Sequence, residues 1–132
     1  MSSRPIFEFL SETFPVSIDL DLGRMSLLLK ALGSPQRYIP PVIHVAGTNG
    51  KGSVIAFLRR IFEEAGYTVH AYTSPHLVRY NERIRIGGKL ISDEELDMLL
   101  KTCVRINKRR PITFFELMTA AAFLAFRQNP AD

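Results

Sequence analysis

The sequence has very little cysteine, since Cys103 is the only one among its 132 residues. One thiol excludes an internal disulfide framework and a cysteine-rich zinc site, and it is in keeping with a reducing compartment. Long apolar runs are also missing, and the first residues do not show the basic, apolar and small-residue pattern of a signal peptide. We therefore predict a cytoplasmic protein with no membrane partner, in which Cys103 is a small packed residue.

Internal repeats and low-complexity tracts are absent as well, so the chain reads as one continuous series of elements. Hydrophobic residues make up 46% of the chain and charged residues 23%, which is the composition of a folded domain with a core. The net charge of +4 favours anionic partners. Because the basic residues are scattered along the chain, we do not expect nucleic acid to be among them.

Apolar periodicity predicts helices at 5–13 and 21–32, the second of which ends at Gly33 and Pro35. The next elements are expected in the order strand, helix and strand, at 42–46, 53–66 and 68–72. This order predicts that the two strands pair in parallel through a right-handed crossover.

The second half of the chain predicts a hairpin and two capped helices. Residues 80–92 alternate in polarity and turn at Gly87 and Gly88. Alternation places three polar side chains on one side of this hairpin, namely Asn81, Arg83 and Arg85. A serine or threonine followed three residues later by glutamate forms a capping box, and two such pairs open helices at about 93–107 and 114–126: Ser92 with Glu95, and Thr113 with Glu116.

The expected helix at 114–126 is apolar nearly all round, so it requires cover on most of its faces. Two strands do not supply that cover, and a doubly wound sheet would normally continue with another parallel strand where this sequence stops at Asp132. We therefore expect the chain to be a fragment of a larger α/β protein, and we expect the isolated fragment to self-associate.

The strongest chemical signal is a glycine-rich turn between the expected strand at 42–46 and the following helix. Its residues are Gly47, Thr48, Asn49, Gly50, Lys51, Gly52 and Ser53. Glycines let backbone N–H groups converge on an anion, the helix directs its positive end to the same point, and a lysine neutralises phosphate charge. Glycine and asparagine also form ordinary tight turns, which remains the alternative interpretation. A tight turn requires neither the lysine nor the position between strand and helix.

The spacing of this turn differs from the general phosphate-loop pattern, because the first glycine is only three residues before the second and Gly52 replaces the usual hydroxyl residue. The shortened loop resembles that of the Mur ligase superfamily, whose members activate carboxylates with ATP. The run HVAGTNGKGS, with Gly52 after Lys51, is similar to the folylpolyglutamate synthase and dihydrofolate synthase branch. The cell-wall ligases more often have two hydroxyl residues there.

A second segment supports the same branch. Residues 73–84, TSPHLVRYNERI, resemble a signature of that family and follow the loop at the expected distance. Two weaker matches lie at Asp21–Arg24 and Thr113–Glu116, which resemble the family's early folate-contacting loop and its second pterin-side segment. The resemblance spans nearly the whole chain but only the opening portion of a family member.

The resemblance implies a Mur-ligase-type central α/β domain with a parallel sheet flanked by helices, present only in its first part. Residues 1–40 would be a helical lead-in, and residues 41–132 would carry the strand, phosphate loop, helix and following elements. The implied activity is ATP-dependent ligation of L-glutamate to a folate or dihydropteroate carboxylate through an acyl phosphate. The implied cofactors are ATP and Mg2+. The carboxy-terminal domain and several ligands would lie beyond Asp132, so we expect the fragment alone to be inactive and the full-length form to be monomeric.

The resemblance also implies roles for single residues. Lys51 and the loop amides would bind the phosphates, Ser74 would bind Mg2+, and His76 would orient the acyl phosphate. The substrate side would be formed by Leu22, Gly23, Arg24, Arg83, Thr113, Phe114, Phe115 and Glu116.

Most of these residues also have a plainly structural interpretation. Ser74 could simply begin a turn, and His76 could pack within it. Arg83, like Arg85, could be a solvated strand residue. Phe114 and Phe115 could belong to the core, and the capping box alone explains Glu116. We interpret His44 and His70 as structural.

Other functions remain open at this point. A cell-wall Mur ligase would use the same loop, although the segment at 73–84 argues against it. A phosphate-loop kinase or GTPase is disfavoured by the short loop and by the lack of a base-recognition motif. The chain could also be a non-catalytic nucleotide-binding module.

Overall fold

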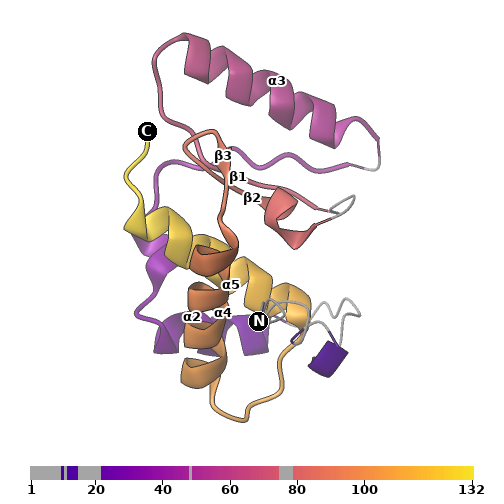
Figure 1. The fold of residues 1–132 in the computed structure, drawn as a ribbon, viewed down its shortest axis with the longest axis vertical. Coiled ribbons are helices and arrows are strands. Elements are labelled where there is room, and N and C mark those ends of the chain that lie inside the picture. The colour runs from indigo at the N-terminus through magenta and orange to yellow at the C-terminus, as the bar shows by residue number, and fades with distance from the viewer. Residues whose placement is uncertain (1–9, 11, 15–21, 48, 75–78) are drawn as a thin grey trace, which may run out of the picture.

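The computed structural model describes residues 10, 12–14, 22–47, 49–74 and 79–132. Its elements are α2 (Gly23–Ala31), η1 (Pro35–Arg37), α3 (Lys51–Glu64), β1 (Ala71–Tyr72), η2 (Tyr80–Arg83), β2 (Ile84–Ile86), β3 (Lys89–Leu90), α4 (Asp93–Asn107) and α5 (Phe114–Gln128). The small sheet lies between α3 on one side and the group of α2, α4 and α5 on the other (Figure 1). Within the described ranges, no helix is long and apolar enough to cross a bilayer.

Local signals correctly predicted where the helices begin and end. Ser92 Oγ accepts a hydrogen bond of 3.1 Å from Glu95 N at the start of α4, as a capping residue should. Helix α2 ends before Gly33, whose φ of 87° is the left-handed conformation that favours glycine. Most of the helix expected at 5–13 lies outside the described residues.

The core is formed where α4 and α5 pack together with α2 and η1. Its fully buried side chains include Leu28, Ile84, Leu96, Leu100, Cys103, Leu117 and Met118. Nine of the fifteen residues of α5 are buried. The expectation that α5 lacks cover was therefore wrong, because helices supply the cover that two strands could not.

Burial of Cys103 in this core raises the pKa of its thiol to about 12, because a thiolate would lose its hydration there. This environment agrees with the prediction that Cys103 is a packed apolar residue.

The hairpin turn was predicted correctly, but residues 80–83 form η2 and not the start of a strand, and the parallel strand pair is not formed in the described residues. Strand β2 pairs antiparallel with both β3 and β1, and the turn between β2 and β3 holds Gly87 and Gly88 at φ values of 58° and 90°. Residues 42–46 have no strand assignment, and the expected strand at 68–72 is reduced to β1. Parallel strands require cover on both faces, and here both segments border a cavity instead of pairing across it.

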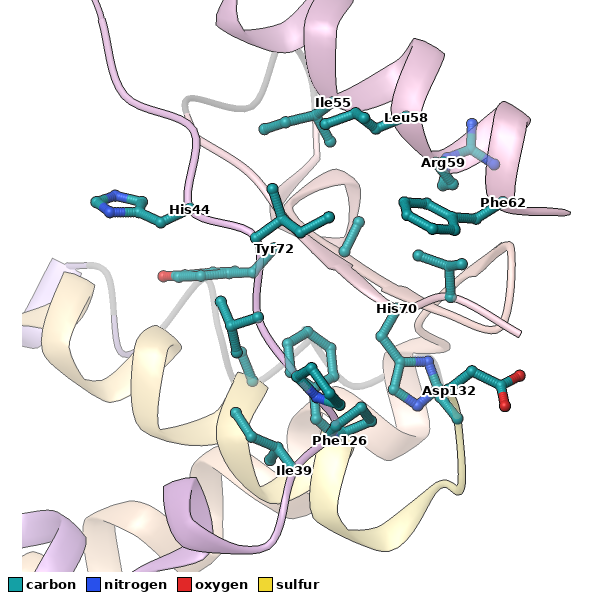
Figure 2. Close-up of a pocket in the computed structure, with 18 of the residues that line it drawn as sticks. Ile39, His44, Ile55, Leu58, Arg59, Phe62, His70, Tyr72, Phe126 and Asp132 are labelled. Carbon is teal, nitrogen blue, oxygen red and sulfur yellow. The ribbon is translucent and has the colours of Figure 1, made fainter. Parts of the chain in front are cut away.

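That cavity, which we call the α3 cavity, has a volume of about 490 Å³ and lies between α3, residues 39–45, residues 67–72 and α5. Ile55, Leu58 and Phe62 face it from α3, with Tyr72 and Phe126 on the opposite side (Figure 2). Helix α3 has no fully buried residue. It is thus the least covered helix that the structure describes.

His70, which lines the α3 cavity, connects its own segment to the turn between β2 and β3 and to the end of α5. Its Nδ1 accepts a hydrogen bond of 2.9 Å from Gly87 N, so Nε2 carries the proton and donates to Asn129 O at 2.7 Å. The ring also stacks on Phe126, with 5.2 Å between ring centroids. The structural interpretation of His70 agrees with these contacts, whereas His44 is exposed.

Candidate active site

The glycine-rich loop lies directly before α3, as predicted, and is open to solvent. Gly47 and Gly50 have φ values of 144° and 74°, and a Cβ added to either would meet nothing within 4 Å. Gly50 is the N-cap residue of α3, and no side chain caps the helix or places a negative charge in its first turn. An uncapped helix start of this kind offers backbone N–H groups and a partial positive charge to an anion.

Lys51 is the first residue of α3 and is half-buried, whereas Asn49, Gly52 and Ser53 are exposed. The side chain of Lys51 therefore starts from the same helical turn that carries the uncapped N–H groups. Thr48 lies outside the described residues. The loop has the open backbone and the neighbouring lysine that phosphate binding requires.

Ser74 is exposed in a bend just after β1. In Figure 1 the first turn of α3 lies at the right-hand edge of the molecule, and the chain leaves β1 towards the same side. Among the described residues, no group of three or more His, Cys, Asp or Glu side chains is placed to hold a metal ion. A Mg2+ ion that keeps several waters needs only one or two protein ligands in addition to phosphate oxygens, so a lone serine hydroxyl is compatible with it. His76 lies outside the described residues.

The signature segment is held in place by Asn81, a residue to which sequence reasoning gave no role. Asn81 is buried in η2, and its Nδ2 donates a hydrogen bond of 2.8 Å to Ile91 O just after β3. Arg79 N donates to Glu82 Oε2 at 2.9 Å, and Arg79 Nη2 donates to Asp93 Oδ1 at 2.6 Å. These bonds fix η2 against the hairpin and the start of α4. Alternation had placed Asn81 with Arg83 and Arg85 on one side of a hairpin, whereas the structure has it buried in η2.

Arg83 lies among aromatic rings. Its guanidinium carbon is 5.8 Å from the centroid of the Tyr80 ring and 5.9 Å from that of Phe115. Phe115 is half-buried, whereas Phe114 is buried and meets Tyr80 edge to face at 5.0 Å. The core interpretation thus applies to Phe114. Phe115 and Arg83 form a partly accessible surface that combines an aromatic ring with a positive charge.

The two weaker sequence matches come together in the structure. Arg24 Nε donates to Glu116 Oε1 at 3.0 Å, and Arg24 Nη2 donates to Glu116 Oε2 at 3.2 Å. Glu116 also completes the capping box of α5 with Thr113, through bonds of 2.9 and 3.1 Å. Leu22 and Gly23 are exposed, and they directly precede Arg24 in the sequence. Sequence reasoning selected both Arg24 and Glu116 but did not predict that they pair.

Comparisons with known proteins identify relatives of this chain. No protein-family model matches the sequence. A curated dihydrofolate synthase/folylpolyglutamate synthase of Bacillus subtilis is 45% identical over 119 residues, which are 81% of this chain and 26% of that protein.

Two solved structures are also similar. Escherichia coli FolC in complex with DHPP and ADP superposes with a TM-score of 0.87 at 36% identity, covering 96% of this chain and 30% of that one. A bifunctional folylpolyglutamate synthase/dihydrofolate synthase with Mn, AMPPNP and L-glutamate bound gives a TM-score of 0.81 at 34% identity, covering 89% and 29%.

The fold and the open loop before α3 define the class, which is the phosphate-loop α/β fold of the Mur ligases. This confirms the predicted fold class, although the parallel pair is not formed in the described residues. Within that class, the chain belongs to the folylpolyglutamate synthase/dihydrofolate synthase family. It spans between a quarter and a third of the length of the relatives described above.

Proposed function

We propose that the chain is the amino-terminal part of an ATP-dependent ligase that joins L-glutamate to a folate or dihydropteroate carboxylate. The observation that carries this proposal is the open, uncapped loop at the start of α3, with Lys51 on its first turn. It occurs in a chain that superposes on a FolC complexed with ADP and DHPP at a TM-score of 0.87.

In this proposal, the amides of residues 47–53 surround the β and γ phosphates of ATP, and Lys51 neutralises part of their charge. The glycines are suited to this because a ligand can approach their backbone without meeting a side chain. The Ser74 hydroxyl would hold Mg2+ together with phosphate oxygens and water. When bound, Mg2+ would supply charge neutralisation for phosphoryl transfer. The relative with bound AMPPNP and Mn is consistent with this cofactor pair.

The segments 22–24 and 113–116 lie on the substrate side in this proposal, together with Arg83. Their proximity across the Arg24–Glu116 pair supports placing them in one site. Phe115 would contact the pterin or aminobenzoyl ring, and Arg83 would attract a carboxylate. His76, which lies outside the described residues, would orient the acyl phosphate.

The reaction that we propose has two steps. The substrate carboxylate oxygen attacks the γ-phosphorus of ATP, which forms an acyl phosphate and releases ADP. The amine of L-glutamate then attacks the acyl carbon, the C–O bond to phosphate breaks, and the amine loses a proton as the amide forms. Lys51 and the loop amides contribute by positioning the γ-phosphoryl group and offsetting its charge.

The proposal is tested on the full-length protein that contains this chain. With ATP, Mg2+, L-glutamate and either dihydropteroate or tetrahydrofolate, we expect phosphate release and addition of one glutamate. Lys51→Ala should abolish turnover while circular dichroism and the unfolding midpoint stay unchanged. A folded wild-type protein that forms no product with either acceptor would refute the ligase. Full turnover by Lys51→Ala would refute the role of this lysine.

The 132 residues alone are proposed to bind nucleotide without catalysing ligation. They span only about 30% of the relatives, so most of a ligase site is contributed from elsewhere. A non-catalytic nucleotide-binding protein is the second candidate, since an exposed, uncapped loop is suited to binding a nucleotide whether or not ligation follows. Binding of ATP by the full-length protein without any glutamylated product would select this second candidate.

A further inference from the structure

The Arg24–Glu116 pair joins positions that are 92 residues apart in the sequence. Two parallel bonds, from Nε to Oε1 and from Nη2 to Oε2, give the bidentate geometry in which a guanidinium meets a carboxylate most specifically. The carboxylate is largely shielded from water, since only 7% of Glu116 is exposed. Ion pairs of this kind are less screened than surface pairs.

The carboxylate of Glu116 is already occupied by protein donors. Oε1 accepts from Thr113 N as well as from Arg24, and Oε2 accepts from Arg24. These three bonds use most of the four acceptor positions of a carboxylate. A substrate donor would therefore have to displace a bond within the protein. This geometry favours a positioning role over direct substrate binding.

The start of α2 lies next to the Arg24–Glu116 pair. Its N-cap residue, Leu22, makes no side-chain capping bond, and no acidic residue lies in the first turn. Leu22 and Gly23 are both exposed. The side chain of Arg24 joins this turn to the start of α5, where Thr113 and Phe115 lie.

We infer that Arg24 and Glu116 act together as positioning residues that set the separation between residues 22–24 and residues 113–115. This inference rests on the proposed function, in which both segments face the pterin-containing substrate. Neither side chain needs to touch that substrate. The pair acts by holding the two walls of the site at the distance that the substrate requires.

A double-mutant cycle on the full-length protein tests this inference. Glu116→Gln keeps the capping box, because glutamine also serves at this position, but removes the ion pair. Arg24→Ala removes the same ion pair from the other side. Arg24→Lys keeps the positive charge but cannot make two parallel hydrogen bonds to the carboxylate. Arg60→Ala is the matched control, since Arg60 pairs with Glu64 on the exposed surface of α3.

If the two residues act through each other, each single change raises KM for the pterin-containing substrate about tenfold, and the double change raises it about tenfold as well. The KM for ATP should stay within about twofold of the wild-type value, Arg24→Lys should lie between wild type and Arg24→Ala, and Arg60→Ala should have no effect.

Effects that multiply in the double variant would overturn the inference, because residues that contact substrate independently behave in that way. An equal rise in the KM for ATP, or no change in either KM, would overturn it too. An inactive wild-type protein would instead refute the proposed function, and it would refute this inference as well. Thermal unfolding of every variant separates a loss of folding from a loss of positioning, and Arg24→Lys remains informative if Arg24→Ala does not fold.

Discussion

Tyr72 donates its hydroxyl proton to Thr119 Oγ1 at 2.8 Å, because Thr119 in turn donates its own proton to Phe115 O at 3.0 Å. This bond joins β1 to α5 next to the α3 cavity. Burial raises the pKa of Tyr72, while the positive charge of Arg83 opposes that rise.

Tyr72→Phe should therefore destabilise the fold by about 1 kcal/mol, because Thr119 keeps its own bond to Phe115 but loses a donor. Urea unfolding followed by circular dichroism measures the difference. Tyr67→Phe is the control, since about half of Tyr67 is exposed. Equal unfolding midpoints for Tyr72→Phe and wild type would show that the bond contributes no net stability.

Alkaline pH should destabilise the protein through Cys103. The pKa of this thiol is about 12 in the folded state, against an ordinary value near 9. The unfolded chain therefore loses this proton first, and the contribution of Cys103 to stability is complete below pH 9 and is lost as the pH rises towards 12. A pKa difference of about three corresponds to about 4 kcal/mol over the whole interval.

Cys103→Ala should reduce the slope of the unfolding free energy against pH between 9 and 11, although it lowers stability at neutral pH by removing a packed group. Unfolding in urea across this pH range gives the slope. A slope identical to that of the wild type would mean that other groups, Tyr72 among them, account for the alkaline loss.

Two glycines of the phosphate loop should respond in opposite directions to the same change. Gly50→Ala places a Cβ at φ 74° and should cost about 1 kcal/mol. Gly52→Ala lies within α3 at an ordinary φ with open space around it, and should stabilise the helix by about 0.5–1 kcal/mol. Thermal unfolding of the two variants compares them. Similar shifts of the same sign would contradict the left-handed conformation of Gly50.

The isolated 132 residues should self-associate through α3, not through α5 as the sequence suggested. Val54, Phe57 and Ile61 repeat at helical spacing and are all exposed, Phe57 by 70%. Sedimentation velocity should therefore detect dimers or larger species at micromolar concentrations. Phe57→Lys should shift the distribution towards monomer, whereas Met98→Lys, on the exposed face of α4, should not. A wild-type chain that sediments only as monomer would refute the prediction.

Elements that depend on neighbouring residues were predictable from the sequence. The capping boxes at Ser92 and Thr113 and the glycine turn at 87–88 are each formed by residues within four positions of one another. Their geometry follows from local chemistry, so the starts of α4 and α5 and the turn of the hairpin were predicted close to their observed limits. The position of the glycine-rich loop directly before α3 was predictable for the same reason.

Relationships across the chain were not predictable in this way. The bidentate bond between Arg24 and Glu116 depends on how α2 docks against α5, which no local pattern encodes. Residues 42–46 have the composition of a strand, yet strand pairing is decided by partners and by cover on both faces. Residues 42–45 and their expected partner, residues 68–72, border the α3 cavity without pairing, so local propensity alone was insufficient.

The position of Cys103 also provides a native reporter of core motion. It is the chain's only cysteine, and none of its surface is exposed. A thiol reagent can react with it only when the packing around α4 opens transiently, so the labelling rate reports the frequency of that opening. Transient opening of the core can thus be timed without introducing another cysteine, and each substitution above that keeps Cys103 can be compared by its labelling rate.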